Sequence, residues 1–217
     1  MKLTGMFLYP DLVEYRSGAA QEFRNQTRFI CHYLQRHVAA RKVQTEGFNK
    51  ICVVCKRAPA ERAYKNSSNA LISEVGFDMG AYEQLAAEQL PEYFIALLEA
   101  GLAKCSQEQH ISNEYFQEAI QSFRADHYKN EWVYAEKTFR AAGIQCRLRC
   151  ALDLSDFRLT LEIEHNGALV FSQEILSTLP DEIAYAHRFK DIVLDDDAVI
   201  VRDKFGQPLV AVPLGDL

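Results

Sequence analysis

The spacing of apolar residues predicts a strand, a long helix and two further strands in the first third of the chain. LTGMFLY (3–9) is an apolar run closed by a proline, which is typical of a strand. From Ser17 to about Lys42, apolar residues recur three and four positions apart, which is the period of an amphipathic helix. FNKICVVCKR (48–57) and ALISEVGF (70–77) are short apolar runs, and each predicts a strand.

Three helices are predicted in the middle of the chain. Asp78 has a side chain that is favoured at helix N-caps. Pro91 opens a second helix, because proline is tolerated at the first helical position. The third helix covers residues 112–142, where apolar residues keep a helical spacing until Gly143, a residue type that often ends helices.

From Ile144 onward the apolar period changes to two, which predicts antiparallel strands. A two-residue turn at Ser155-Asp156 places Arg149 opposite Glu162 and Arg147 opposite Glu164, so the outward charges pair with opposite sign. This agreement between turn length and charge favours that register.

The following hairpin is predicted to turn through a three-residue loop, His165-Asn166-Gly167, which sets Ile163 opposite Leu169 and keeps the apolar face continuous. Residues 180–187 then predict a short helix. Strands are predicted near 191–194 and 198–202, and a last strand at 209–212 lies between two prolines, which is typical of a sheet edge.

These elements predict an α+β fold, in which an antiparallel C-terminal sheet of about five strands (144–213) packs against an N-terminal helical layer with two or three additional strands. Residues 1–217 are expected to form a single α+β domain. The alternative is a division into a helix-rich part, 1–142, and a β-rich part, 143–217.

Charge is distributed unevenly along the chain, whose net formal charge is −6. Residues 16–65 contain eleven Lys and Arg against three Glu, whereas residues 66–217 contain twelve against twenty-five acidic residues. The two charges either neutralise each other within the fold or mark surfaces for partners of opposite sign. The start of the chain has no secretory pattern and no long apolar run, so a cytoplasmic protein without membrane contact is expected.

The six cysteines are expected to be free thiols in a reducing compartment. Cys52 and Cys55 form a C-x-x-C motif inside a predicted strand. Residues three apart on a strand point to opposite faces, which favours two core thiols over a zinc or redox site. We therefore predict no metal and no cofactor.

Two other groups of residues have spacings that suit a metal-dependent enzyme. His127 and Glu131 are four apart on the predicted helix, and Asp195, Asp196 and Asp197 lie between two short strands. A hydrogen-bonded pair and a solvated turn are the alternative interpretations. The chain has none of the common nucleotide-binding, nucleophile-elbow or zinc-protease motifs.

The sequence favours a non-enzymatic protein-binding module, most concretely a bacterial immunity-type inhibitor that blocks a toxic enzyme through an acidic surface. Asp181, Glu182, Asp195, Asp196 and Asp197 are the predicted partner-binding residues, and a basic toxin domain is the expected partner. The alternatives are the metal-dependent enzyme above and a phosphate or nucleic-acid binder that uses the basic segment 16–65. The acidic net charge and the scarcity of aromatic residues in that segment argue against nucleic acid.

Overall fold

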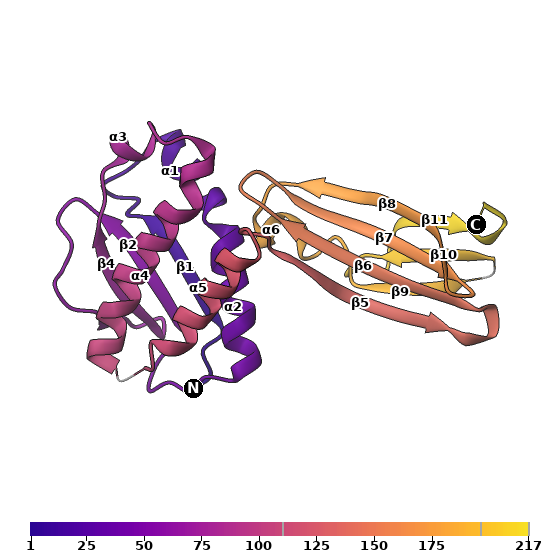
Figure 1. Cartoon of the computed structure of the whole chain (residues 1–217), viewed down its shortest axis with the longest axis horizontal. Coiled ribbons are helices and arrows are strands. Elements are labelled where there is room, and N and C mark those ends of the chain that lie inside the picture. The colour runs from indigo at the N-terminus through magenta and orange to yellow at the C-terminus, as the bar shows by residue number, and fades with distance from the viewer. Residues whose placement is uncertain (110, 196, 217) are drawn as a thin grey trace. The chain divides into compact units, whose positions relative to one another are not determined.

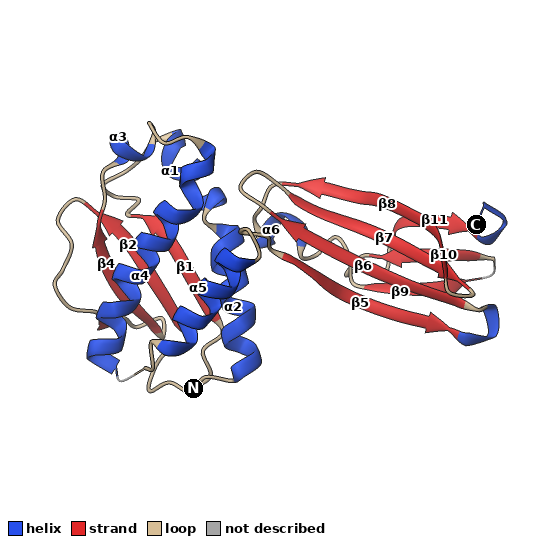
Figure 2. Ribbon diagram, in the orientation of Figure 1, coloured by secondary structure: helices blue, strands red, loops and turns tan. Residues whose placement is uncertain are grey.

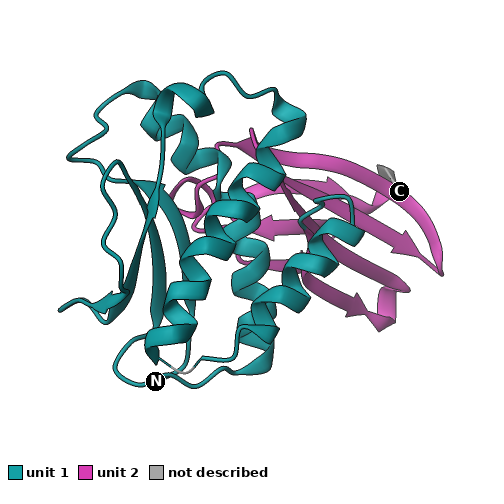
Figure 3. Ribbon diagram, turned by 60° about the vertical axis from the view of Figure 1, so that its left-hand side comes forward, with its two compact units in different colours: residues 1–130 teal, residues 131–217 magenta. Residues whose placement is uncertain are grey.

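The computed structural model describes residues 1–109, 111–195 and 197–216 and shows an α+β fold, which confirms the predicted class (Figure 2). The chain divides into two compact units, Met1–Asn130 (unit 1) and Glu131–Leu217 (unit 2) (Figure 3). None of the helices in the described residues is long and apolar enough to cross a membrane.

Unit 1 is an α/β unit built on a mostly parallel sheet with the strand order β1-β2-β4-β3. β1, β2 and β4 are parallel, and the short β3 pairs with β4 in the opposite direction at the edge. The elements are β1 (Gly5–Pro10), α1 (Gly18–Gln26), α2 (Arg28–Arg41), β2 (Lys50–Lys56), β3 (Tyr64–Lys65), β4 (Ala70–Gly76), α3 (Met79–Tyr82), the 3₁₀ helix η1 (Ala87–Gln89), α4 (Leu90–Gln109) and α5 (Glu114–Ala125).

The helices α2, α4 and α5 lie over one face of this sheet (Figure 1). Residues that alternate along each strand separate the two faces. Val53 on β2 packs against Gly101 of α4, and the hydroxyl of Ser73 on β4 donates to the Gly101 carbonyl at 2.9 Å, so this row faces the helices. Cys52 and Val54 point the other way, into a separate apolar cluster.

The two cysteines of the C-x-x-C motif therefore lie on opposite faces of β2, as predicted. Both are buried free thiols. Burial raises the pKa of each thiol, most strongly for Cys55, which disfavours the reactive thiolate.

The long helix predicted from Ser17 to Lys42 is two helices that meet at Thr27. Thr27 is fully buried, and its hydroxyl donates to the carbonyl of Leu8 at 2.8 Å. This hydrogen bond fixes the junction of α1 and α2 beside β1. The apolar stripe continues across the junction, and for that reason the sequence pattern did not reveal it.

Unit 2 contains two antiparallel sheets with the strand orders β5-β6-β7-β8 and β11-β10-β9, instead of the predicted single sheet. β11 is an edge strand, as predicted. The elements are β5 (Glu131–Phe139), the 3₁₀ helix η2 (Arg140–Ala142), β6 (Ile144–Leu152), β7 (Phe157–His165), β8 (Ala168–Thr178), α6 (Glu182–Tyr185), β9 (Asp191–Asp195), β10 (Ala198–Arg202), β11 (Pro208–Pro213) and the 3₁₀ helix η3 (Leu214–Asp216).

Aromatic rings form part of the core of unit 2. The ring of Phe157 on β7 stacks on Tyr185 of α6, with 3.7 Å between the centroids. Phe189 lies parallel to Phe157 at 5.6 Å and meets Tyr134 of β5 edge-on at 4.7 Å. The aromatic rings of α6 and of the segment that follows it thus pack against the four-stranded sheet, in the core of unit 2.

The helix predicted over 112–142 is wrong in its second half. α5 ends at Ala125, and His127 and Tyr128 have positive φ angles of 54° and 60°, which a helix cannot contain. Residues 131–139 form β5, which pairs with β6. The apolar spacing there fits a short helix as well as a strand, and pairing with a distant segment decides between them.

The predicted register of β6 and β7 is wrong by two residues. Arg147 pairs with Glu162 across the hairpin, because the loop has four residues, 153–156, and not two. The Asp153 carboxylate accepts the backbone N–H groups of Ser155 and Asp156, both at 2.9 Å, and this stabilises the longer loop.

A shift of two residues leaves every side chain on its predicted face. The predicted charge pairs therefore still meet, but diagonally across the strands. Arg149 lies 3.7 Å from Glu162, and Arg147 donates to Glu164. The charge pattern is satisfied by both registers, which explains why it did not distinguish them.

The predicted three-residue loop of the next hairpin is also wrong. His165 pairs with Ala168 across a two-residue turn in which Asn166 and Gly167 have φ angles of 52° and 84°. This is the turn that an Asn-Gly pair favours. A bulge at Val170 then turns Phe171 to the apolar face opposite Ile163, and a second bulge at Ile175 turns Leu176 to that face opposite Leu159.

Candidate functional site

The predicted acidic residues occupy two places in unit 2. Asp181 caps α6, where its carboxylate accepts the N–H of Ile183 at 3.1 Å, and Glu182 is the first residue of that helix. Asp195 ends β9 and is paired with Arg202 at 2.9 Å. Asp197 comes directly before β10, and Asp196 lies outside the described residues.

These carboxylates do not form one surface. Figure 1 shows α6 at one end of unit 2, and the end of β9 with the start of β10 at the other. The structure thus brings Asp195 near Asp197 but separates both from the pair on α6.

The residues proposed for a metal-dependent enzyme are not on one helix. His127 lies in the turn after α5, and Glu131 is the first residue of β5. The spacing of four residues therefore no longer predicts that their side chains meet. In the described part of the chain, no group of three or more His, Cys, Asp and Glu residues is arranged to hold a metal ion.

Four arginines of the basic segment lie in two different environments. Arg36 donates to the Asn130 side chain at 2.7 Å, and Arg41 donates to Glu118 of α5, so both take part in packing within unit 1. Arg24 and Arg28 instead line a cavity beside β1.

The side of the parallel sheet turned away from α2, α4 and α5 is apolar. We call it the helix-free face. Cys52, Val54, Ala70 and Ile72 form its centre, and the half-buried rings of Phe7 and Tyr9 pack against them. Parallel sheets are normally covered on both faces, because their strands carry apolar side chains on each side.

Charged side chains gather at one end of the helix-free face, where β1, β2 and β4 terminate. Asp11 follows β1, Lys56 ends β2, and Glu74 is near the end of β4. The Lys56 ammonium lies 3.3 Å from Asp11, 3.5 Å from Glu74 and 3.9 Å from Glu14. We call these four residues the carboxylate cluster. The carboxyl ends of parallel strands are the usual location of ligand sites in α/β sheets.

Hydrogen bonds from the backbone hold the carboxylates in place. Asp11 accepts the N–H of Val13 at 2.7 Å, and Glu74 accepts the N–H of Ala60 at 2.8 Å. The Tyr64 hydroxyl donates to Glu74 at 3.0 Å. The cluster is therefore ordered before any ligand arrives, which reduces the entropy cost of binding.

The same contacts shift the pKa values in the cluster. Burial alone raises the pKa of Asp11 and Glu74, but the backbone N–H groups and Lys56 outweigh it, and both pKa values lie below their usual range. The hydrogen bond to Asp11 raises the pKa of Lys56. Asp11 and Glu74 therefore stay ionised beside the Lys56 ammonium at neutral pH, and the cluster attracts cations.

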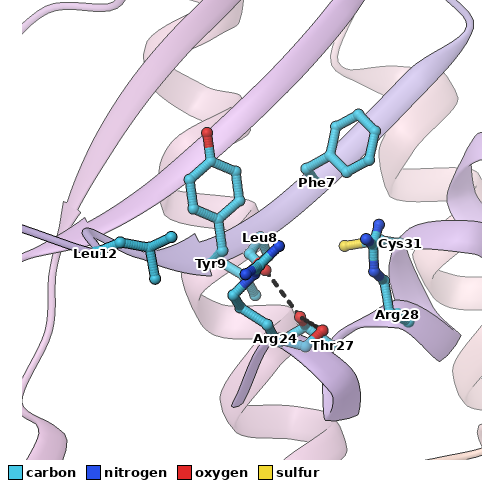
Figure 4. A pocket seen from close by; sticks show the side chains of 8 residues that line it. All are labelled: Phe7, Leu8, Tyr9, Leu12, Arg24, Thr27, Arg28 and Cys31. Carbon is cyan, nitrogen blue, oxygen red and sulfur yellow. Dashed lines mark hydrogen bonds between the residues drawn. The ribbon is translucent and has the colours of Figure 1, made fainter. Parts of the chain in front are cut away.

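A cavity of about 390 Å³ opens over this cluster. Its polar wall is Asp11, Lys56, Asn66 and Glu74, and its apolar wall includes Tyr9 and Tyr64. A second cavity of about 200 Å³ lies beside it and shares the lining residues Tyr9 and Leu12. We call the first the carboxylate cavity. The second, whose lining residues are drawn in Figure 4, we call the arginine cavity.

Sequence reasoning missed the carboxylate cluster. One signal was present: Glu74 is a charge inside the apolar run ALISEVGF. The parallel alignment of three strands brings Asp11, Lys56 and Glu74 together, and apolar periodicity does not reveal strand order. Comparison with known proteins finds no family model, no curated protein and no solved structure that matches the chain.

Proposed function

We propose that this is a non-enzymatic protein-binding module, and in its most concrete form a bacterial immunity-type inhibitor that holds a toxic enzyme inactive. The helix-free face of unit 1 carries the proposal. The central side chains of this face are buried, and the half-buried rings of Phe7 and Tyr9 that pack against them are the part that a partner can reach. A partner protein that packs on these rings adds an outer layer of the kind that parallel sheets normally have.

The chemistry beside this face selects the partner. Three ordered carboxylates surround one ammonium, so an Arg or Lys side chain entering the carboxylate cavity gains charge-assisted hydrogen bonds. Tyr9 and Tyr64 offer aromatic walls, which favour a guanidinium and are frequent at interface hot spots. A basic loop of the toxic enzyme is the expected occupant.

Unit 2 contributes a long-range electrostatic field. It contains nine Lys and Arg against fifteen Asp and Glu, a formal charge of −6, whereas unit 1 has fifteen of each. Asp181, Glu182, Asp195 and Asp197 belong to this excess and remain candidate contacts. Such a field raises the rate at which a basic partner associates.

Co-expression tests the proposal. The product of the adjacent reading frame is expressed in a bacterial host with and without this protein, and growth is measured. We expect growth inhibition by the neighbour and rescue by this protein. Isothermal titration of the purified pair then gives the affinity. A neighbour that is neither toxic nor bound contradicts the immunity-type function.

Variants locate the surface. Tyr64→Ala and Glu74→Gln should each weaken the complex about tenfold or more. Glu46→Gln, which removes an exposed carboxylate that lines neither cavity, should leave the affinity unchanged. If Asp195→Asn and Asp197→Asn abolish binding while Tyr64→Ala and Glu74→Gln do not, the interface is the acidic end of unit 2, and the helix-free face is the wrong surface.

A further inference from the structure

The arginine cavity lies between β1 and the junction of α1 with α2 (Figure 4). Phe7 and Tyr9 of β1 and Leu12 of the next loop give it an apolar and aromatic side. Arg24 of α1 and Arg28 of α2 give it a cationic side. Among its lining residues, all of which the structure describes, none is acidic.

The two guanidinium groups reach the cavity from the same side. Arg24 and Arg28 are four residues apart across the helix junction, a spacing that places side chains on one face. Figure 4 shows Arg24 extending beneath Tyr9, and Arg28 beside Phe7. The guanidinium carbon of Arg28 lies 5.5 Å from the centre of the Phe7 ring.

This arrangement is held in place before a ligand binds. The buried Thr27 hydroxyl donates to the carbonyl of Leu8, so the helix junction cannot move away from β1 without breaking a buried hydrogen bond. Arg24 also donates to the Gln21 side chain at 3.3 Å, and the Arg28 guanidinium lies over the Phe7 ring. Arginine side chains restrained in this way lose less entropy on binding an anion.

We propose that the arginine cavity binds a small phosphate monoester with an aromatic body. Two guanidinium groups match a doubly charged phosphate, whose oxygens accept several N–H groups at once. The rings of Phe7 and Tyr9 match an aromatic group, which packs edge-to-face or offset against them. A volume of about 200 Å³ admits a ligand smaller than a drug-sized molecule.

Phenyl phosphate is the probe, titrated into the full-length chain by isothermal calorimetry, with inorganic phosphate and benzoate as comparisons. We expect a dissociation constant below about 1 mM for phenyl phosphate. Inorganic phosphate lacks the ring and benzoate lacks the second charge, so each should bind at least about tenfold more weakly. Equal affinity for inorganic phosphate, or no binding of phenyl phosphate, overturns the proposal.

The pH dependence is a second measurement. The second ionisation of a phosphate monoester has a pKa of about 6, so affinity should fall as the pH is lowered from about 7 to about 5. Benzoate stays ionised across this range and should show no comparable fall. Affinity for phenyl phosphate that does not change with pH contradicts recognition of the dianion.

Substitutions assign the site. Arg24→Gln and Arg28→Gln should each weaken binding of phenyl phosphate about tenfold or more. Arg28→Lys keeps the charge and tests the same residue if Arg28→Gln does not fold. Arg62→Gln removes an exposed positive charge outside the cavity and should have no effect. Unchanged affinity in a folded Arg24→Gln variant refutes the assignment.

This inference does not depend on the proposed partner protein. Tyr64 and Glu74, which test protein docking, do not line the arginine cavity, and Arg24 and Arg28 do not line the carboxylate cavity. Loss of partner binding with phenyl phosphate binding intact, or the reverse, therefore shows which proposal has failed.

Discussion

The substitution Gly101→Ala in α4 tests the packing of this helix on the sheet, which positions the carboxylate cluster. A β-carbon at this position would lie 2.6 and 2.7 Å from the two γ-carbons of Val53 on β2. Rotation of the Val53 side chain about its Cα–Cβ bond turns only one of these methyl groups away and leaves another in contact. Gly101→Ala therefore forces α4 away from the sheet. One turn later, Lys104 donates to the carbonyls of Glu74 and Ala60 at 2.6 and 2.8 Å, and the same displacement weakens both bonds.

The expected change in unfolding free energy follows from two opposed effects. Overpacking of a well-packed core costs about 1–3 kcal/mol. Replacing glycine by alanine inside a helix contributes about 1 kcal/mol of stability. Gly101→Ala should therefore destabilise the protein by up to about 2 kcal/mol. Urea unfolding followed by far-ultraviolet circular dichroism measures this, since most of the helix lies in unit 1.

Gly18→Ala is the matched control, because nothing lies within 4 Å of a β-carbon at this first residue of α1. It should leave stability unchanged or raise it by about 0.5–1 kcal/mol. In the double variant Gly101→Ala/Val53→Ala, the cost of Gly101→Ala should largely disappear. If Gly101→Ala stabilises the protein as much as Gly18→Ala does, the close approach of α4 to β2 is refuted.

Three further measurements address the turn, the carboxylates and the thiols. Gly167 has a φ angle of 84° and open space around it, so Gly167→Ala should cost about 1–2 kcal/mol through backbone strain alone, seen as a lower melting temperature; an unchanged melting temperature contradicts this turn. Because the pKa values of Asp11 and Glu74 are lowered in the folded state, their stabilisation is present above the usual values of 3.8 and 4.5 and is lost as the pH falls through the lower folded values. The difference in unfolding free energy between the native chain and Glu74→Gln, measured by urea unfolding, should therefore be constant near neutral pH and shrink in acid. A difference that persists at about pH 3 argues against a lowered pKa of Glu74 in the folded state. Burial raises the pKa of Cys105 to about 12 and that of Cys146 to about 11, so a thiol reagent at about pH 8 should label these residues only on unfolding, and rapid labelling of the native chain would contradict their burial.

Local patterns predicted much of the fold. β2 and β4 are short apolar runs whose buried character is decided by composition alone, and β9 and β10 were found where predicted. The segment 131–139 was assigned to a helix because a few apolar residues fit both periods. Its pairing with β6 is a non-local interaction that no local pattern contains.

The faces of the first hairpin in unit 2 were predicted correctly, but its pairs were not. Arg147 has an acidic residue within reach in either register, so charge complementarity gives no preference. The Asp153 side chain decides the loop length through its hydrogen bonds to the backbone. Such capping depends on geometry that a count of turn residues does not specify.

The candidate site was outside the reach of sequence reasoning for a related reason. Asp11, Lys56 and Glu74 are separated by long stretches of chain and meet only because β1, β2 and β4 are parallel neighbours. The acidic residues that were proposed instead are clustered in sequence. Adjacency in sequence is visible without a structure, whereas adjacency across a sheet is not.

The two bulges of β8 bear on whether this strand can pair with a strand of another molecule. β8 is the terminal strand of its sheet, Leu169 and Val170 are exposed on it, and Glu174 is its single charged residue. A long outer strand of this kind is a template on which strands of other molecules can assemble into fibrils. The extra residues at Val170 and Ile175 break the regular spacing of backbone groups along it, so an incoming strand cannot form an uninterrupted ladder over its length.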